Sequence, residues 1–419
     1  MLRRCFSLLN FYKGDIMTFT KPEAIAIFKS CAQEYKRELL NRNLLVVFGT
    51  PSNMHFVQLA FGKKNFEHLT GVISHLQGKD RKNLFYIKSL QGNLSPNDFD
   101  FRDDGTTEMK ISTLKEAMKI AHTAKQIGDY NNKRPKIIAD KATGTSRWCI
   151  ALVDEGGGYL RPCSLLNDDT RNNTTKSLPV IGILRRKRDD SHSLYKEITY
   201  TAKDIDVCDL LASIRKVFPT QISDTMYGLV KNPDMTNPAS DPYIATEYRL
   251  NDGVFTRGEN LFIGKKPDCD HMIQSYSEDK PPPQVSIYQL KEPDSEQGKL
   301  FLDKGAVAIK ENGLIPTADM FTKVYEFGIP QISEKDELAK KLNEIYERFR
   351  KEPPAGFHGR KLGVGDVIIF DNIPFMINKE NFQAVLTLKK EKAIEGQIKN
   401  SQDVKDKVQV KSKKKKPIR

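Results

Sequence analysis

The chain contains no run of about 18 apolar residues, the length that a helix needs to cross a membrane. Its six cysteines are spread over 419 residues, and no two lie close enough to form a metal-binding or redox pair. A disulfide framework is therefore not expected, and a reducing cytoplasm fits this cysteine usage. The only signal-like segment is 1–19, which starts with basic and apolar residues. Because Asn10 interrupts the apolar stretch and no small-residue cleavage site follows, we interpret 1–19 as a leader or, preferably, an overlong gene start before Met17.

Positive charge is unevenly distributed. The net charge is +13, and the last 33 residues, 387–419, carry +8 of it from 12 basic and four acidic side chains. The rest of the chain is therefore only mildly basic, so the high isoelectric point is no evidence that the folded part binds nucleic acid. We expect 387–419 to be a disordered Lys-rich tail that attracts polyanions without selectivity or simply improves solubility.

Hydrophobic residues make up 38% of the chain, enough for two or three cores. Thr20, Pro22 and Glu23 form the start signal of a helix that continues to about residue 41. Further patterns predict a strand at 44–48, helices at 79–91 and 110–127, strands at 137–138, 148–153, 159–166, 180–184 and 195–201, and a helix at 207–217. Helices followed by an antiparallel meander indicate an α+β domain over 20–220.

The second half reads as a less regular segment and a smaller domain. Residues 221–284 show weak periodicity and end in three prolines at 281–283, so we expect a linker or an extension there. A second folded unit spans 285–386, with a helix whose apolar stripe includes Leu342 and Phe349 and a hairpin formed by 367–370 and 375–377.

Several blocks in the first domain occur in a recognisable order. They are NFEHLTGV at 65–72, IGDY at 127–130, IADKATG at 138–144, YLRPCSLL at 159–166, VIGILRRK at 180–187 and LYKEITYTAKD at 194–204. Together they resemble the fourth phage-associated branch of the barnase–EndoU–colicin–RelE-like nucleases, over about 20–215. The resemblance implies helices packed on an antiparallel sheet and RNA cleavage without a metal or any other cofactor.

The second unit carries VSIYQLKE at 285–292, LNEIYERFR at 342–350 and FHGRKLGVGDVIIF at 357–370. These blocks resemble the YodL-like domain, over about 285–385, although the family usually has Ser where this chain has Gly363 and Gly365. YodL-like domains occur in composite proteins of phages and conjugative elements, which implies a small α+β module for protein interaction.

Metal-free RNA cleavage uses the 2′-hydroxyl to attack the adjacent phosphate, so it needs a proton acceptor, a proton donor and cations. His68 is the first candidate for proton transfer, because its pKa class suits neutral pH; the alternative is a partly buried histidine that stabilises a turn. Arg185, Arg186 and Lys187 end a strand and are candidates for phosphate contacts, with Arg185 assigned to substrate binding. The alternative is that these three basic residues are simply the solvent-exposed end of the strand.

Hydroxyl groups complete the predicted site. Tyr195 and Thr199 lie four residues apart on one strand and therefore face the same side, and Thr70 is a further hydroxyl donor for substrate binding. Each of the three is also an ordinary structural residue of its element. A metal site is not predicted, since His55 and His68 lack helical ligand spacing and no Cys or carboxylate group joins them.

Three functions fit the sequence. The leading one is an endoribonuclease-like effector of a phage or mobile element that acts on RNA, tRNA being one candidate substrate, with the YodL-like domain binding a protein partner. The alternative is a noncatalytic RNA- or protein-binding module of the same kind of element, because the sequence offers one good histidine and no obvious acid partner. A third alternative is a degenerate nuclease retained as an antitoxin-like or decoy module.

Overall fold

The computed structural model describes residues 19–133, 135–188, 193–233, 242–279, 282–329, 335–354, 357–370, 372–385 and 388. Almost all of 1–19 and 387–419 lies outside this set, so the leader and tail remain predictions. The chain divides into two compact units. The first comprises Met1–Lys231 with Ala245–Asn260, and the second Asn232–Ile244 with Leu261–Arg419. Within the described residues, no helix is long and apolar enough to span a membrane.

The first unit begins with the predicted helix, α1 (Lys21–Glu38). The Thr20 hydroxyl accepts a hydrogen bond from the Glu23 amide, and the Glu23 carboxylate accepts one from the Thr20 amide at 2.8 Å, so the capping box is confirmed. Phe28 and Tyr35 lie on the buried side. The other helices here are α2 (Lys63–Thr70), α3 (Arg81–Gln91), the 3-10 turn η1 (Pro96–Asp98), α4 (Thr106–Ala117), α5 (Ile120–Thr123), α6 (Thr170–Asn173) and α7 (Val207–Val217).

The strands of the first unit close into a barrel. The ring consists of β1 (Arg42–Thr50), β2 (Asn53–Ala60), β8 (Leu160–Leu166), β7 (Cys149–Asp154), β6 (Lys141–Gly144), β5 (Gln126–Tyr130) and β9 (Thr174–Lys187), in this order. A pairing of β1 with β9 closes it. Neighbours are antiparallel except β2 and β8, which are parallel. Separate from the ring, β3 (Ile73–Ser74) pairs with β4 (Phe99–Asp100).

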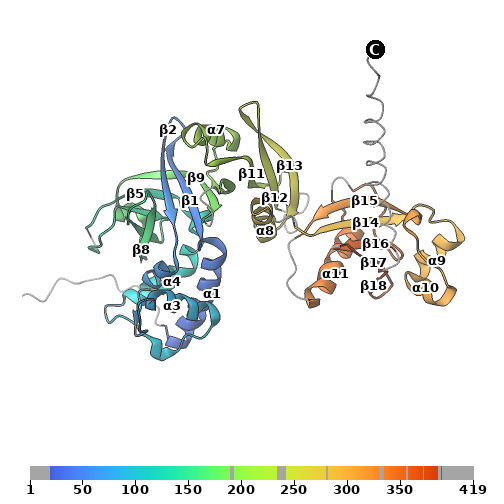
Figure 1. Cartoon of the computed structure of the whole chain (residues 1–419), viewed down its shortest axis with the longest axis horizontal. Coiled ribbons are helices and arrows are strands. Elements are labelled where there is room, and N and C mark those ends of the chain that lie inside the picture. The colour runs from blue at the N-terminus through green and yellow to red at the C-terminus, as the bar shows by residue number, and fades with distance from the viewer. Residues whose placement is uncertain are drawn as a thin grey trace, which may run out of the picture. The chain divides into compact units, whose positions relative to one another are not determined.

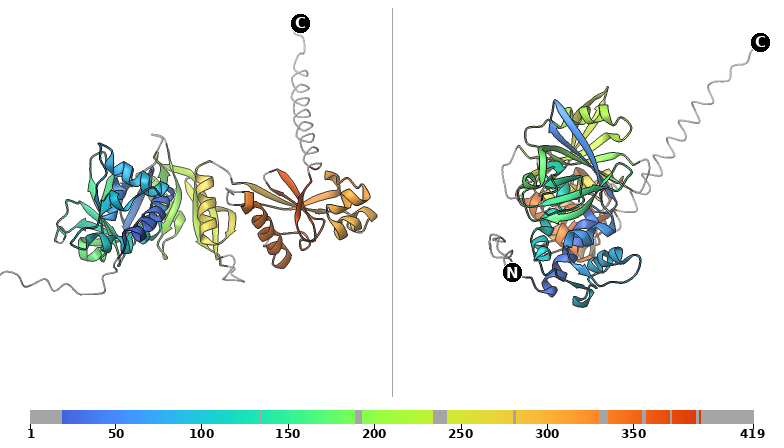
Figure 2. Two further views of the ribbon diagram at one scale, coloured as in Figure 1. Left: turned by 90° about the horizontal axis from the view of Figure 1, so that it is seen from below. Right: turned by 90° about the vertical axis from the view of Figure 1, so that its left-hand side faces the viewer.

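Barrel closure changes the predicted arrangement within a confirmed α+β class. The sequence led us to expect helices packed on an antiparallel sheet, whereas the sheet closes into a barrel and the helices α1, α3 and α4 gather at one end of it (Figure 1). The same layering is visible from a second direction (Figure 2, right). The cause is the length of β9, whose first half pairs with β5 and whose second half pairs with β1 and β10 (Tyr195–Thr201).

One core joins the barrel interior to the helices. Leu44 and Val46 from β1, Leu59 from β2 and Trp148 belong to the same buried cluster as Phe28 of α1. The alternate β1 residues point to the outer face, where α7 covers them. The apolar run of β1 is therefore continuous because both of its faces are buried.

The sheet continues beyond β10 into the segment that we expected to be a linker or an extension. The segment contains β11 (Ile222–Lys231), β12 (Tyr243–Asn251), β13 (Val254–Gly264) and the helix α8 (Lys266–Ser277). β11 is parallel to β10. Their side chains do not alternate strictly between apolar and polar residues, which is why the sequence pattern did not predict these strands.

The second unit contains an antiparallel sheet in the order β15 (Phe321–Gly328), β14 (Gln284–Leu290), β16 (Val367–Phe370), β17 (Ile373–Ile377) and β18 (Phe382–Ala384). The predicted hairpin is the β16–β17 pair. α11 (Lys335–Lys351) packs on one face through Leu342 and Phe349. The opposite face carries α9 (Glu296–Lys304) and α10 (Val307–Asn312), and the 3-10 turn η2 (Ala318–Met320) precedes β15.

Candidate functional site

The sequence block NFEHLTGV forms helix α2 and its C-cap. The Asn65 side chain accepts a hydrogen bond from the Gly62 amide at 2.8 Å and donates one to the Pro162 carbonyl at 3.0 Å. These two bonds start the helix and tie it to β8. Phe66 and Leu69 are fully buried in the core, and the helix ends at Gly71, whose positive φ of 74° favours glycine. His68 is thereby left at the half-buried surface of α2.

Two lysines from other helices contact His68. The Lys82 ammonium of α3 lies 3.0 Å from His68 Nε2. The Lys110 ammonium of α4 donates to the His68 main-chain carbonyl at 3.1 Å and to the Ser164 hydroxyl of β8 at 3.0 Å. Gly71 gives the Lys110 side chain its space, because a Cβ there would lie 2.6 Å from Lys110 Cδ. We call His68, Lys82 and Lys110 the His68 cluster.

Burial and charge shift the pKa values of this cluster. Burial lowers the pKa of His68, and the charges of Lys82, Lys110 and Lys64 lower it further. The imidazole is therefore neutral at pH 7, with Nε2 accepting a hydrogen bond from Lys82. Burial also lowers the pKa of Lys110 to about 8. Perturbed values of this kind are typical of functional sites.

The pKa of Glu67, the residue that precedes His68 in the chain, is also shifted. Burial raises the pKa of Glu67, while the charges of Lys82 and Arg81 oppose that rise. Its Oε2 atom is buried and, within the described part of the chain, has no hydrogen-bond partner. A carboxyl that is costly to ionise thus lies beside a neutral histidine and two cations.

Further charges lie near the cluster, on α2, in the connection between β7 and β8, and on β8 itself. Glu155 accepts a hydrogen bond from Lys64 at 2.7 Å and forms an ion pair with Arg161 at 3.3 Å. More lysine side chains than carboxylates surround His68, so this surface favours the binding of an anion.

The predicted residues on β9 and β10 form other groups. Arg186 donates to the Tyr159 hydroxyl and to the Ser193 carbonyl, both at 2.9 Å, and its guanidinium lies 4.6 Å from the centre of the Tyr195 ring. The Tyr195 hydroxyl donates to the Gln58 side chain at 3.0 Å. The structure therefore brings Arg186 and Tyr195 together, with Lys187 next in the strand, but in a different set of contacts from those of His68.

Arg185, Thr199 and Thr70 make internal contacts. Arg185 is buried and forms ion pairs with Glu38 of α1 and Glu197 of β10. The Thr199 hydroxyl donates to two main-chain carbonyls, Ala121 at 2.7 Å and Ile183 at 3.1 Å. These geometries hold elements together and leave little for a substrate to contact.

Thr70 is equally enclosed. Its hydroxyl is fully buried and donates to the Glu67 carbonyl at 2.7 Å. His55, by contrast, is exposed, and its ring lies 5.4 Å from that of Phe48. No group of three or more His, Cys, Asp or Glu side chains able to hold a metal ion occurs among the described residues.

Sequence reasoning predicted His68 but missed Lys82, Lys110 and Glu67. One signal for Lys110 was available. Thr107, Lys110, Leu114 and Ala117 recur at helical spacing on the buried side of α4, and a lysine inside such a stripe needs a partner or a function. Nothing local indicated that Lys82 faces His68.

Two family models match the chain. Residues 27–203 match the model described as phage-Barnase-EndoU-ColicinE5/D-RelE like nuclease4, and residues 284–375 match that of the YodL-like domain. The chain thus joins a nuclease-like domain to a YodL-like domain. Both resemblances found in the sequence are therefore confirmed by these matches. No curated protein and no solved structure matches the chain.

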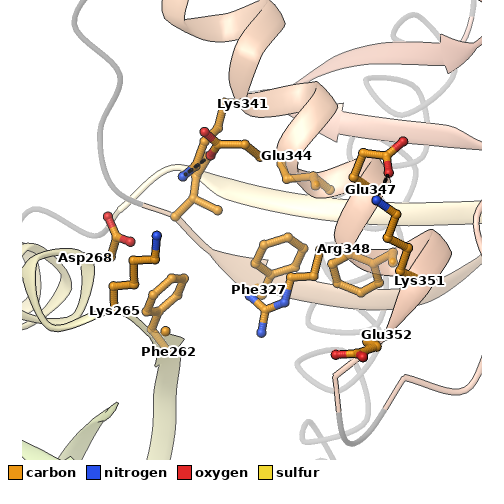
Figure 3. Close-up of a pocket in the computed structure, with 14 residues that line it drawn as sticks. Phe262, Lys265, Asp268, Phe327, Lys341, Glu344, Glu347, Arg348, Lys351 and Glu352 are labelled. Atoms are coloured by element: carbon orange, nitrogen blue, oxygen red, sulfur yellow. Dashed lines mark hydrogen bonds and ion pairs between the residues drawn. The ribbon is translucent and has the colours of Figure 1, made fainter. Parts of the chain in front are cut away.

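The second unit has a hollow of about 710 Å³. Its apolar wall includes Phe262, Phe327 and Phe349, and charged side chains of α11 stand around it (Figure 3). Those charges pair with one another, as in the contact of Lys341 with Glu344 at 3.0 Å. The hollow therefore offers apolar contact area with a nearly neutral rim.

Proposed function

We propose that the amino-terminal domain is a metal-independent endoribonuclease that acts as a cytoplasmic effector of a phage or other mobile element. The observation that carries this proposal is the His68 cluster on the NFEHLTGV block, in which Lys82 contacts the neutral imidazole and Lys110 donates to the main-chain carbonyl of the same residue. The family match supports a nuclease-like activity, and the chemistry of the cluster supports RNA as its substrate.

The cluster supplies the groups that 2′-hydroxyl attack requires. Neutral His68 is placed to accept the 2′-hydroxyl proton through Nε2 once Lys82 turns to the phosphate. Lys82 then stabilises the charge that develops on the phosphorane oxygens. Lys110, with a pKa of about 8, is the candidate donor of a proton to the departing 5′-oxygen. The products are a 2′,3′-cyclic phosphate and a 5′-hydroxyl.

The first test is incubation of the full chain with total RNA, with tRNA, and with DNA of matched sequence, all in excess EDTA. We expect cleaved RNA bearing cyclic-phosphate ends and intact DNA, because DNA lacks the 2′-hydroxyl. Cleavage of DNA, or activity that EDTA abolishes, would contradict the proposed chemistry.

The pH dependence of cleavage should be bell-shaped. Rates rise with pH as His68 loses its proton, below its usual value of 6.5, and fall as Lys110 loses its own near pH 8. Replacing Lys110 with arginine should move the alkaline limb upward, because a guanidinium stays protonated. Profiles of kcat/KM from pH 5 to 10 measure both limbs, and an alkaline limb unchanged in Lys110→Arg would remove Lys110 from the mechanism.

A second candidate function is noncatalytic binding of a protein partner through the YodL-like domain. The hollow lined by Phe327 and Phe349 favours it (Figure 3). Expression in bacteria separates the two functions. Growth arrest that His68→Gln relieves supports the nuclease, whereas harmless expression of a folded protein supports the binding module.

A further inference from the structure

A second hollow lies next to the His68 cluster, within the first unit. Its volume is about 470 Å³. It is bounded by the first residue of α2, the segment that precedes α3, and one side of α3; the lining residues are Lys63, Gln77, Gly78, Lys79, Asp80, Asn83, Leu84 and Ile87. None of them belongs to the site described above.

The hollow and the His68 cluster share two helices. On α3, Lys82 contacts His68 and the next residue, Asn83, lines the hollow. On α2, Lys63 lines the hollow and His68 follows five residues later, about 7.5 Å along the helix axis. The hollow and the cluster are therefore built on the same two neighbouring helices.

The lining combines three kinds of contact. Leu84, 37% exposed, and Ile87 present an apolar surface. Gln77 donates to the His75 carbonyl at 3.0 Å, which leaves its amide oxygen as an acceptor. The amide of Asn83 reaches Asp80 only at 3.5 Å, a weak bond that a ligand can replace.

Lys63 and Lys79 add positive charge to the same rim, which also carries one carboxylate, Asp80, so the lining has a net charge of about +1. An apolar face, two amides and flanking cations together match a nucleobase with its phosphates. An acidic peptide would use the cations but not the two amides beside an apolar wall.

We propose that this hollow binds the base of the nucleotide adjoining the cleaved phosphodiester and that Asn83 and Gln77 read its edge. The inference rests on the proposed ribonuclease function and adds a specificity subsite to it. Lys63 and Lys79 then contact the phosphates that flank that base.

The test uses the full chain and four pentaribonucleotides that differ in one base between uridines. Binding is measured by fluorescence anisotropy in the His68→Gln background, and cleavage is measured in the otherwise unchanged chain. We expect Asn83→Leu to weaken binding of the preferred pentanucleotide about tenfold and to reduce the preference among the four bases. The effect on cleavage should fall on KM more than on kcat.

The matched control is Asn93→Leu, which changes an exposed asparagine just beyond α3 and outside the hollow. Asn83→Ser provides a smaller change at the same position should leucine disturb folding. Equal binding and equal base preference for the Asn83 variants and the control would overturn the inference while leaving the nuclease proposal intact.

A failure of the nuclease proposal alone can also be recognised. If no form cleaves RNA but Asn83→Leu still weakens RNA binding relative to Asn93→Leu, the subsite stands and the nuclease proposal fails. If the unchanged chain binds none of the pentanucleotides, or binds an acidic peptide more tightly than any of them, the inference is overturned.

Discussion

Replacing His68 with glutamine is expected to reduce RNA cleavage by about 10²–10⁴-fold, the range typical of a lost general base. In the unchanged chain the Lys82 ammonium lies 3.0 Å from His68 Nε2. Glutamine can still accept a hydrogen bond from Lys82, but it cannot take up a proton at neutral pH. The variant therefore separates proton transfer from the packing of α2. Single-turnover rates with enzyme in excess measure the chemical step directly.

The control for this experiment is His55→Gln, which changes an exposed histidine on β2 outside the cluster. We expect its cleavage rate to equal that of the unchanged chain. Both variants should bind RNA with similar affinity, because Lys82 and Lys110 remain. Full cleavage by folded His68→Gln would exclude His68 as the proton acceptor and return attention to Arg186 and Tyr195.

The largest expected effect on stability comes from Arg185. Its buried guanidinium forms ion pairs with Glu38 and Glu197, and Glu38 also contacts His122 at 2.9 Å. Replacing Arg185 with methionine leaves two buried carboxylates without their shared cation, so the free energy of unfolding should fall by about 3–5 kcal/mol. Urea unfolding followed by the fluorescence of Trp148, the single tryptophan, reports on the barrel because Trp148 is buried in its core.

Arg37→Met is the matched control, because Arg37 pairs with the same Glu38 at 2.8 Å but is 57% exposed. An exposed ion pair contributes less than about 1 kcal/mol, so this change should be small. Equal effects of the two substitutions would contradict the structural role of Arg185. They would revive its predicted role in substrate binding.

The ion pairs of Arg185 and Glu38 also predict how the free energy of unfolding depends on pH. Burial opposes the ionisation of Glu38, but the hydrogen bond from His122 and the charge of Arg185 outweigh burial and hold the pKa of Glu38 well below its usual value of 4.5. A lowered pKa stabilises the fold above pH 4.5, and this contribution is lost as pH falls below that value. The unchanged chain should therefore lose more stability on acidification than Arg185→Met does.

Local signals in the sequence were enough for several elements of the first unit, but not for β2, α2, β5 or β6. The capping box at Thr20 and Glu23 predicted the start of α1, and the short β-rich run Tyr195–Thr201 predicted β10 with its observed bounds. The helix α7 also has the predicted bounds, Val207–Val217. Such elements are specified by caps and periodicity within about 20 residues, so the sequence alone contains the information.

The site was only partly predictable for the same reason. His68 stood out through its block and its chemistry, but its partners Lys82 and Lys110 are 14 and 42 residues further along the chain. Arg185 looked like a phosphate ligand because its neighbours are basic. Its carboxylate partner Glu38, 147 residues away, became evident only in the folded structure.

By itself, the sequence determined the α+β class, the two family modules, the helices α1, α3, α7 and α11, and the choice of His68. Tertiary structure alone decided that β1 pairs with β9 to close a barrel, that β11, β12 and β13 extend its sheet, and which cations surround His68. The physical reason is that helix caps and side-chain periodicity are local properties. Strand pairing and burial of charge, in contrast, depend on segments that meet only when the chain has folded.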